Sequence, residues 1–320
     1  MVRARRGDGV CIWHTGLSGA GKSRPRGCPR VLRYPCAVPL YRLHEPINLV
    51  SPRLVAAFDS WIDAGSASTT AAAKLADDGE VVATFDADLL FDYRARRPTL
   101  EIADGRPAEL TWPELVLRRS RVGERDVLVL AGPEPDFRWR ELSEAAVELG
   151  RRLGIVEWIS IGAIPATVPH TRPVPMLGTE SAPGLLRGDV LAGPSGLLRV
   201  PAAAISVLDF AVSRSGIPTV GYFAQVPHYI SGEYPAAAIE LLRAVERHLG
   251  GTIPLGELPR EARELRSRLD IATGADENTR GYVERLEAVV DEARLPSGDD
   301  LISEIEQFLR DRGPEDSPRP

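Results

Sequence analysis

The sequence has little cysteine, and all of it lies near the N-terminus. Its three cysteines fall within the first 40 of 320 residues, and the spacings between Cys11, Cys28 and Cys36 match neither a CxxC pair nor a zinc quartet. No HExxH or HxxxH spacing is present either. We therefore expect no metal site, no cofactor, and a chain that works in a reducing cytoplasm.

Long apolar runs and an excess of basic residues are absent as well. No stretch approaches the ~20 apolar residues of a membrane-spanning helix, and the N-terminus lacks the apolar core and cleavage site of a secretory signal. The formal net charge is −6, whereas contacts with nucleic-acid phosphates need a basic face. Neither a membrane nor a nucleic acid is therefore an expected partner.

The residues that are present fit a globular chain of about two domains. Apolar residues make up 43% and charged residues 26% of the sequence, which is enough for a sizeable core and excludes a mainly disordered protein. Residues 1–40 carry a charge of +7, from seven Arg and Lys22 against Asp8, which leaves −13 for residues 41–320. We interpret residues 1–40 as a disordered basic extension, or as a spurious stretch that arises from an upstream start codon or a truncated gene fragment.

One short motif in this extension has a defined chemistry. Residues 16–23 read GxxxxGKS, the loop whose backbone N–H groups hold phosphates while Lys22 meets the β- and γ-phosphates and Ser23 binds Mg²⁺. With residues 12–15 it resembles the start of an adenylylsulfate kinase. Such a loop must open a helix, but prolines follow directly and prevent one. We therefore favour a chance match, and a P-loop nucleotide kinase is a remote alternative. The residues concerned are Gly16, Gly21, Lys22 and Ser23.

From residue 52 onward, strand patterns alternate with helix patterns. Short apolar runs predict strands at residues 53–58, 80–85, 110–118, 126–131, 155–161 and 216–224. Helical patterns occupy residues 64–77, 139–153, 201–215 and 235–249. This alternation predicts an α/β fold with a layered, mostly parallel sheet and helices on both faces. Pro113 would place its strand at an edge of the sheet.

After residue 250 the pattern becomes entirely helical. Its spacing predicts helices over residues 259–269, 277–293 and 299–311. We expect an α/β domain over residues 41–250 and a helical appendix over residues 251–312, which caps the sheet or mediates self-association. Residues 313–320 would form a frayed tail.

Two loops after predicted strands carry acidic and aromatic residues, and ligands bind at the carboxyl ends of strands in open α/β sheets. The first loop could form a binding site, or Asp63 could cap the next helix while Trp61 packs in the core. In the second loop, the charges could bind a ligand or only cap and solvate the following helix. The candidates are Asp59, Trp61, Asp63 and Gly65 in the first loop and Asp136, Arg138 and Trp139 in the second.

Residues 163–196 contain six prolines and form an unusually long predicted loop. A structureless loop of about thirty residues is usually functional or disordered. His170 and Arg172, near Glu180, could support acid–base chemistry, but no nucleophile precedes them, so we favour a loop that contacts a partner or a second copy. His228, after the last strand, fits a hydrogen-bonded structural residue or a further contact residue.

Several of these segments together carry a family resemblance. They are residues 58–65, 132–136 with 138–139, 162–165 with 168–175, 193–196 and 226–229. In this order they resemble the proteasome assembly chaperone 2-like (PAC2) family, in its actinobacterial branch, and they add Gly193 to the candidates. The similarity covers about residues 45–312. It departs at residues 1–40 and at Ser60, where a glycine is commoner.

The resemblance implies a self-associating α/β domain similar to the phosphorylase/hydrolase-like folds. Eukaryotic relatives are non-catalytic chaperones that pair proteasome α-subunits into rings. We therefore expect a non-catalytic interaction or assembly-chaperone-like protein, a homo-oligomer with an exposed apolar patch and with proteasome subunits as candidate partners. The alternative is a small-molecule hydrolase or ligand-binding protein. Its candidate residues, Asp59, Asp63, Asp136, His170 and Arg172, would then converge on one cleft with a perturbed pKa.

Overall fold

The computed structural model describes residues 39–44, 48–77, 79–188, 190–193 and 196–293. By its internal contacts the chain divides into residues 1–40 and residues 41–320, and the elements below belong to the second unit. The phosphate-loop match, the three cysteines, the helix predicted over residues 299–311 and the tail lie outside the described residues.

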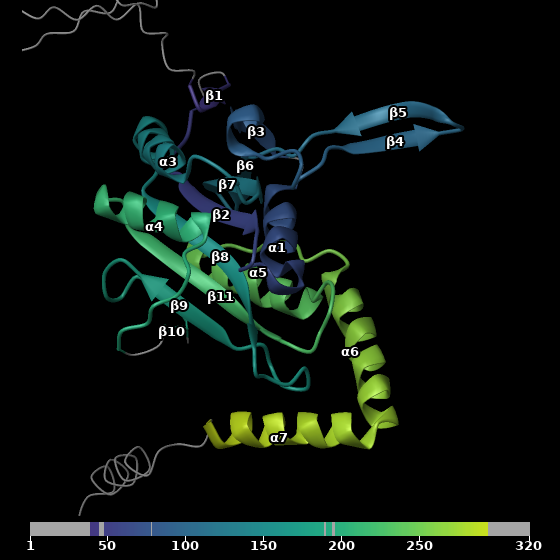
Figure 1. Cartoon of the computed structure of the whole chain (residues 1–320). Coiled ribbons are helices and arrows are strands. Elements are labelled where there is room, and N and C mark those ends of the chain that lie inside the picture. The colour runs from purple at the N-terminus through teal and green to yellow at the C-terminus, as the bar shows by residue number, and fades with distance from the viewer. Residues whose placement is uncertain (1–38, 45–47, 78, 189, 194–195, 294–320) are drawn as a thin grey trace, which may run out of the picture. The chain divides into compact units, whose positions relative to one another are not determined.

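A nine-stranded mixed sheet forms the centre of this unit (Figure 1). The four central strands, in the order β7-β2-β8-β11, are parallel, whereas β1, β3 and β6 pair antiparallel on one side and β9 pairs antiparallel with β11 on the other. The predicted α/β fold is confirmed, with the parallel pairing concentrated at the centre. In spatial order the strands are β1 (Tyr41–Leu43), β3 (Glu80–Phe85), β6 (Val116–Val122), β7 (Arg125–Pro133), β2 (Arg53–Asp59), β8 (Glu157–Ala166), β11 (Thr219–Pro227), β9 (Met176–Glu180) and β10 (Leu191–Ala192).

Helices cover both faces of the sheet (Figure 1). α1 (Ala67–Ala76) and α5 (Pro235–Leu249) pack on one face, and α3 (Trp139–Leu153) and α4 (Ala204–Arg214) pack together on the other. Because the central strands are covered on both sides, they occur in the sequence as continuous apolar runs. Two short elements complete this part: the 3-10 turn η1 (Ala64–Ser66) and α2 (Ala87–Leu90).

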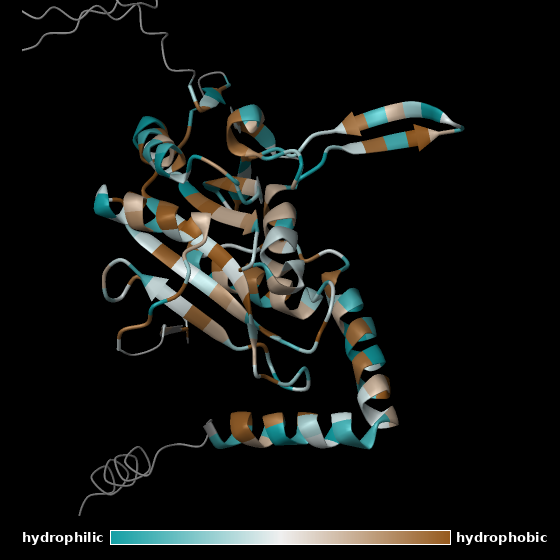
Figure 2. Cartoon of the chain, in the orientation of Figure 1, coloured by the Kyte–Doolittle hydropathy of each residue, from teal (hydrophilic) through white to brown (hydrophobic). Residues whose placement is uncertain are grey.

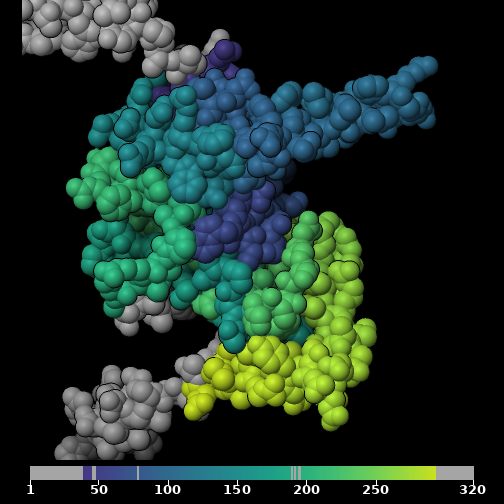
Figure 3. Space-filling view, viewed as in Figure 1, coloured from purple at the N-terminus to yellow at the C-terminus, as the bar shows by residue number. Residues whose placement is uncertain are grey.

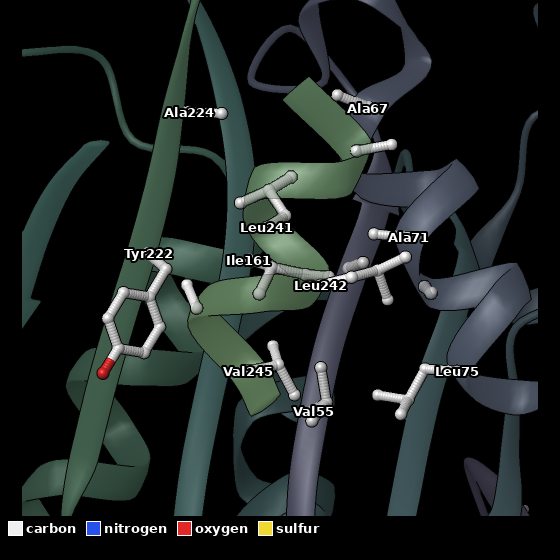
Figure 4. Close-up of a cluster of buried hydrophobic side chains, with 14 of the residues drawn as sticks. Val55, Ala67, Ala71, Leu75, Ile161, Tyr222, Ala224, Leu241, Leu242 and Val245 are labelled. Carbon is white, nitrogen blue, oxygen red and sulfur yellow. The ribbon is translucent and has the colours of Figure 1, made fainter. Parts of the chain in front are cut away.

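An apolar core lies between the sheet and the pair formed by α1 and α5 (Figure 4). Val55 of β2 points into it, since side chains alternate between the faces of a strand. α5 contributes Leu242 and Val245, and α1 contributes Ala71 and Leu75. The many alanines of α1 allow the two helices to approach each other closely.

The structure corrects the prediction of one strand over residues 110–118. Instead, β4 (Thr99–Ala103) and β5 (Arg106–Thr111) form a separate hairpin, and β6 begins only at Val116. Pro113 lies between β5 and β6, since it has no N–H to donate within a sheet. Every residue of the hairpin is exposed, although Leu100, Ile102 and Leu110 are large and apolar (Figures 2 and 3).

The proline-rich segment 163–196 is also more ordered than predicted. β8 continues to Ala166, β9 pairs with β11, and β10 pairs with β9. The strand pattern was hidden because glycine and proline interrupt the apolar residues of β9 and β10.

Two further helices follow α5 with little apolar burial. α6 (Leu258–Ala275) packs against α5, and α7 (Glu277–Ala293) packs against α6. In these two helices only Leu258, Val283 and Leu286 are buried among the apolar side chains. Both helices were predicted from spacing alone, and α6 extends further than the expected residues 259–269.

Candidate functional site

Four loops leave the sheet at one edge. β2, β7, β8 and β11 are parallel, with Asp59 opposite Pro133 and Pro227 opposite Ala166. Their carboxyl ends therefore meet at the edge where α/β proteins bind ligands. All predicted site residues except Gly193 lie at or after the ends of these strands.

Asp63 caps helix α1. Its Oδ1 accepts hydrogen bonds from the N–H of Ser68 at 2.7 Å and from the hydroxyl of Ser68 at 2.6 Å. Its Oδ2 accepts one from the hydroxyl of Thr69 at 2.5 Å. The buried carboxylate is thus engaged by the first turn of the helix, as the capping alternative predicted. Trp61, by contrast, is 52% exposed, so the prediction that it packs in the core is wrong.

Gly65 holds the same loop against the segment before α5. Its φ of +65° lies in the left-handed region, and a Cβ there would lie 2.7 Å from the Cβ of Tyr234. The carbonyl of Gly65 accepts a hydrogen bond from the N–H of Tyr234 at 2.8 Å. The absence of a side chain at this position is therefore a requirement of packing.

Asp59 and Asp136 face one guanidinium. Arg96 lies 3.6 Å from a carboxylate oxygen of each, and its Nε is buried without a hydrogen bond to any described residue. Asp136 also accepts a hydrogen bond from the N–H of Asp92 at 2.9 Å. Arg96 was missed in the sequence because it is distant from both acids along the chain and lies in no recognisable motif.

Arg138 and Trp139 form the start of α3. Arg138 has a φ of +58° and donates a hydrogen bond to Glu141 at 3.0 Å. The indole of Trp139 donates to the carbonyl of Pro135 at 2.5 Å. These contacts stay within the loop and the first helical turn. Arg138 occupies the N-cap position of α3 without a side-chain hydrogen bond to the helix, so its side chain does not cap it.

His170 is buried against α6. Its Nδ1 is hydrogen-bonded to the hydroxyl of Tyr229 at 2.8 Å, and its Nε2 lies 3.3 Å from a carboxylate oxygen of Asp270. Burial, together with the positive charge of Arg266, lowers the pKa of His170. The imidazole is consequently favoured in its neutral form.

Arg172 and its neighbour Thr171 contact α7. Arg172 donates to both carboxylate oxygens of Asp291, at 2.8 and 2.6 Å, and lies 3.2 Å from Glu287. The hydroxyl of Thr171 donates to Glu287 as well. These long-range contacts dock the loop onto the chain's own helices.

The two remaining candidates make structural contacts. His228 lies 3.1 Å from the carbonyl of Ala166 through Nδ1 and 3.2 Å from the hydroxyl of Tyr282 in α7 through Nε2. Gly193 follows β10 and donates its N–H to the carbonyl of Gly178 at 2.5 Å, away from the four loops.

The residues of the enzyme alternative do not converge on one cleft. Asp63 is hydrogen-bonded to the first turn of α1, Asp59 and Asp136 pair with Arg96, and His170 and Arg172 contact α6 and α7. The structure therefore places them in separate small clusters. None of these clusters joins a nucleophile, a base and an orienting acid, which acyl-transfer chemistry of the triad type needs.

A strongly shifted pKa occurs away from these loops. Asp209 of α4 accepts hydrogen bonds from the hydroxyl of Ser160 at 2.5 Å and from the indole of Trp158 at 2.9 Å. Burial raises the pKa of Asp209 to about 7. Both donors lie in β8 beneath α4, so Asp209 belongs to the packing of this helix on the sheet.

Glu134, which follows the end of β7, joins three segments at the loop edge. Its N–H donates to the carbonyl of Asp59 at 3.0 Å, and its carboxylate accepts from the N–H of Ala204 at 2.6 Å. The segments joined in this way expose large apolar side chains, which we call the apolar surface. Its members are Trp61 (52% exposed), Phe137 (50%), Leu197 (82%), Leu198 (61%) and Val200 (60%). The apolar run at residues 197–200, inside an expected loop, was the available sequence signal.

Metal-binding clusters and membrane-spanning helices are both absent from the part of the chain that the structure describes. It contains no group of three His, Cys, Asp or Glu side chains placed to hold a metal ion. None of its helices is long and apolar enough to cross a membrane.

Comparison with known proteins identifies relatives across most of the chain. The PAC2 family model matches residues 57–272. A PAC2 family protein from Streptomyces avermitilis is 37% identical, with a TM-score of 0.66 over 72% of this chain and 99% of its own. A proteasome-assembly chaperone homologue from Mycobacterium tuberculosis is 33% identical, with the same TM-score and coverage. A protein of unknown function from Corynebacterium glutamicum is 31% identical, with a TM-score of 0.75 over 79% of this chain and 97% of its own. No curated protein matches the chain.

Proposed function

Because the chain belongs to the PAC2 family, we propose that it is a non-catalytic, assembly-chaperone-like protein that binds other proteins, with proteasome subunits as its partners. We place it in the cytoplasm as a homo-oligomer. The similarity to a proteasome-assembly chaperone homologue supports this choice of partner.

The observation that carries the proposal is the apolar surface. Five large apolar side chains are each at least half exposed on segments that Glu134 holds together. Burying exposed apolar side chains on association is favourable by about 25 cal/mol per Å², so these five are the candidates for contact with a partner. The long loop fits this role less well, since His170 and Arg172 already contact α6 and α7.

The test measures binding of purified proteasome α-subunits from the same organism to the full chain by sedimentation velocity. We expect binding that is lost in the double variant Trp61→Ser/Phe137→Ser. Ile271→Ser/Val289→Ser is the matched control, because these two side chains are also exposed and apolar but lie on α6 and α7. No binding by the unaltered chain would overturn the choice of partner, and binding retained by the first variant would overturn the choice of surface.

A further inference from the structure

A groove of about 570 Å³ lies between the docked loop, α5 and α6. Its lining has an apolar part, which includes Val174 from the loop, Ile239 from α5 and Leu265 from α6. Three different segments thus build it. None of these residues belongs to the apolar surface.

Arginines surround this apolar lining. The groove is lined by Arg172, Arg243, Arg263 and Arg266, against one carboxylate, Glu240. Glu240 pairs with Arg243, and three carboxylates outside the lining pair with two more of these guanidiniums, so the charges around the groove balance. The groove is therefore rich in guanidinium groups, most of them paired within the chain.

Three of these guanidiniums already have carboxylate neighbours, at 2.6 to 2.8 Å. Arg243 pairs with Glu240, and its side chain is 50% exposed; Arg266 pairs with Asp270 and is 42% exposed. Exposed pairs of this kind contribute little to stability, so a ligand carboxylate can replace or join the present one at small cost. Arg263 makes no hydrogen bond or ion pair with any described residue.

The loop side of the groove is fixed in place. The side chain of His170 is 1% exposed, its Nδ1 is hydrogen-bonded to the hydroxyl of Tyr229 at 2.8 Å, and its Nε2 lies 3.3 Å from a carboxylate oxygen of Asp270 on α6. Arg266 donates to the carbonyl of His170 at 2.9 Å. This contact orients one rim guanidinium relative to the loop, which is a feature of a preformed site.

We infer that this groove binds an acidic peptide segment of a partner protein, with apolar side chains on the apolar lining and carboxylates between the guanidiniums. Guanidinium–carboxylate pairs are directional and can be bidentate, and an amphipathic segment in a groove is a common form of protein recognition. An inorganic anion would leave the apolar lining unused, so a peptide is the occupant that fits both parts. The inference rests on the proposed function only in taking the partner to be a protein.

The test uses the full chain and a fluorescein-labelled 15-residue peptide with glutamate and leucine on opposite faces of a helix. Fluorescence anisotropy measures its affinity, and a peptide with lysine in place of glutamate is the control. We expect Arg263→Glu to weaken binding of the acidic peptide about tenfold or more. Arg268→Glu is the matched control, because Arg268 is also exposed on α6 and makes no ion pair with any described residue, but it does not line this groove.

Besides a lack of peptide binding, three outcomes would overturn the inference. The first is equal binding of the lysine peptide, and the second is equal weakening by Arg263→Glu and Arg268→Glu, which would indicate attraction by charge alone. The third concerns residues 299–311 of this chain, which contain five acidic residues and one arginine. If the peptide binds only after Asp299, Asp300, Glu304 and Glu306 are changed to their amides, the occupant is the chain itself and not a partner.

The result is separable from the proposed function. Loss of peptide binding in Arg263→Glu with unchanged binding of proteasome α-subunits would support the groove as an independent site. Absence of peptide binding by the unaltered chain, with α-subunits still bound, would refute the groove as a peptide-binding site and leave the proposed function standing.

Discussion

Helices α5 and α7 have similar lengths but are held in different ways. α5 spans 15 residues and buries nine of them against the sheet and α1. α7 spans 17 residues and buries only Val283 and Leu286. Its other contacts with the loops are mainly polar, from Thr171 and Arg172 to Glu287 and from His228 to Tyr282, whose ring also lies edge-on to that of Tyr229.

This difference predicts different local stabilities. Apolar burial is insensitive to salt, whereas interactions between partly exposed charges are screened at high ionic strength. α5 should therefore open only when the whole unit unfolds, and α7 should open separately at a smaller free energy. The four predictions below test this contrast, from the largest expected effect to the smallest.

Leu242→Ala should have the largest effect. Leu242 is fully buried between the sheet and α1, so its truncation removes apolar contacts and leaves a cavity. We expect a loss of about 2–5 kcal/mol in the free energy of unfolding, measured by urea denaturation. Leu286→Ala in α7 is the matched control, and an equal loss there would contradict the contrast between the two helices.

Asp209 should make the free energy of unfolding of the sheet and its covering helices depend on pH. Its pKa is raised from 3.8 to about 7 in the folded chain, so between these values the folded state holds a proton that the unfolded chain has lost. The free energy of unfolding should consequently fall as the pH rises from 4 to 7, by at most about 1.4 kcal/mol per pH unit.

Asp209→Asn should remove that dependence, because an amide keeps the shape of the carboxyl group but does not titrate. Thermal denaturation over this pH range measures the change, with Asp276→Asn as a control on an exposed acid whose pKa is lowered instead. An unchanged pH profile in Asp209→Asn would rule out Asp209 as its source.

The third prediction concerns the ion pairs of α7. Arg172→Gln removes the contacts with Asp291 and Glu287, and we expect the protection of α7 amides against hydrogen exchange to fall about fivefold, equivalent to about 1 kcal/mol. Salt at 1 M should have a similar effect on the unaltered chain. Arg243→Gln, which removes a pair within α5, should leave α7 unchanged, and equal loss of protection in α5 would refute the separate opening of α7.

Sequence patterns predicted the parts of the fold that depend on local rules. The bounds of α3, α5 and α7 were confirmed, since apolar spacing and the left-handed glycines Gly154 and Gly250 mark helices directly. The β4–β5 hairpin was missed because neither strand faces a core, so burial imposes no regular apolar pattern on them. The docking of His170 and Arg172 onto α6 and α7 was missed for another reason. Its partners lie about a hundred residues away, and no local spacing encodes such a contact.

The candidate site shows the same limit. The sequence placed the four loops at one edge of the sheet, because the carboxyl ends of parallel strands share an edge. It left two roles open for Asp63, and only the geometry of α1 decides between them. Arg96, which connects two loops, lies in no segment that the sequence analysis selected, and Glu134 lies in one, residues 132–136, without a predicted role of its own.

The smallest expected effect belongs to the β4–β5 hairpin, which has neither the apolar burial of α5 nor the ion pairs of α7. Glu101 lies directly opposite Glu109 in its register, and like charges in such pairs are destabilising. Glu101→Lys should replace this repulsion with attraction and stabilise the hairpin by about 0.5 kcal/mol. Slower hydrogen exchange of residues 99–111, with no change in α5, would be the measured result. Thr99→Lys provides the comparison, because Thr99 lies opposite the uncharged Thr111. If both variants protect the hairpin equally, the repulsion between Glu101 and Glu109 is not what limits its stability.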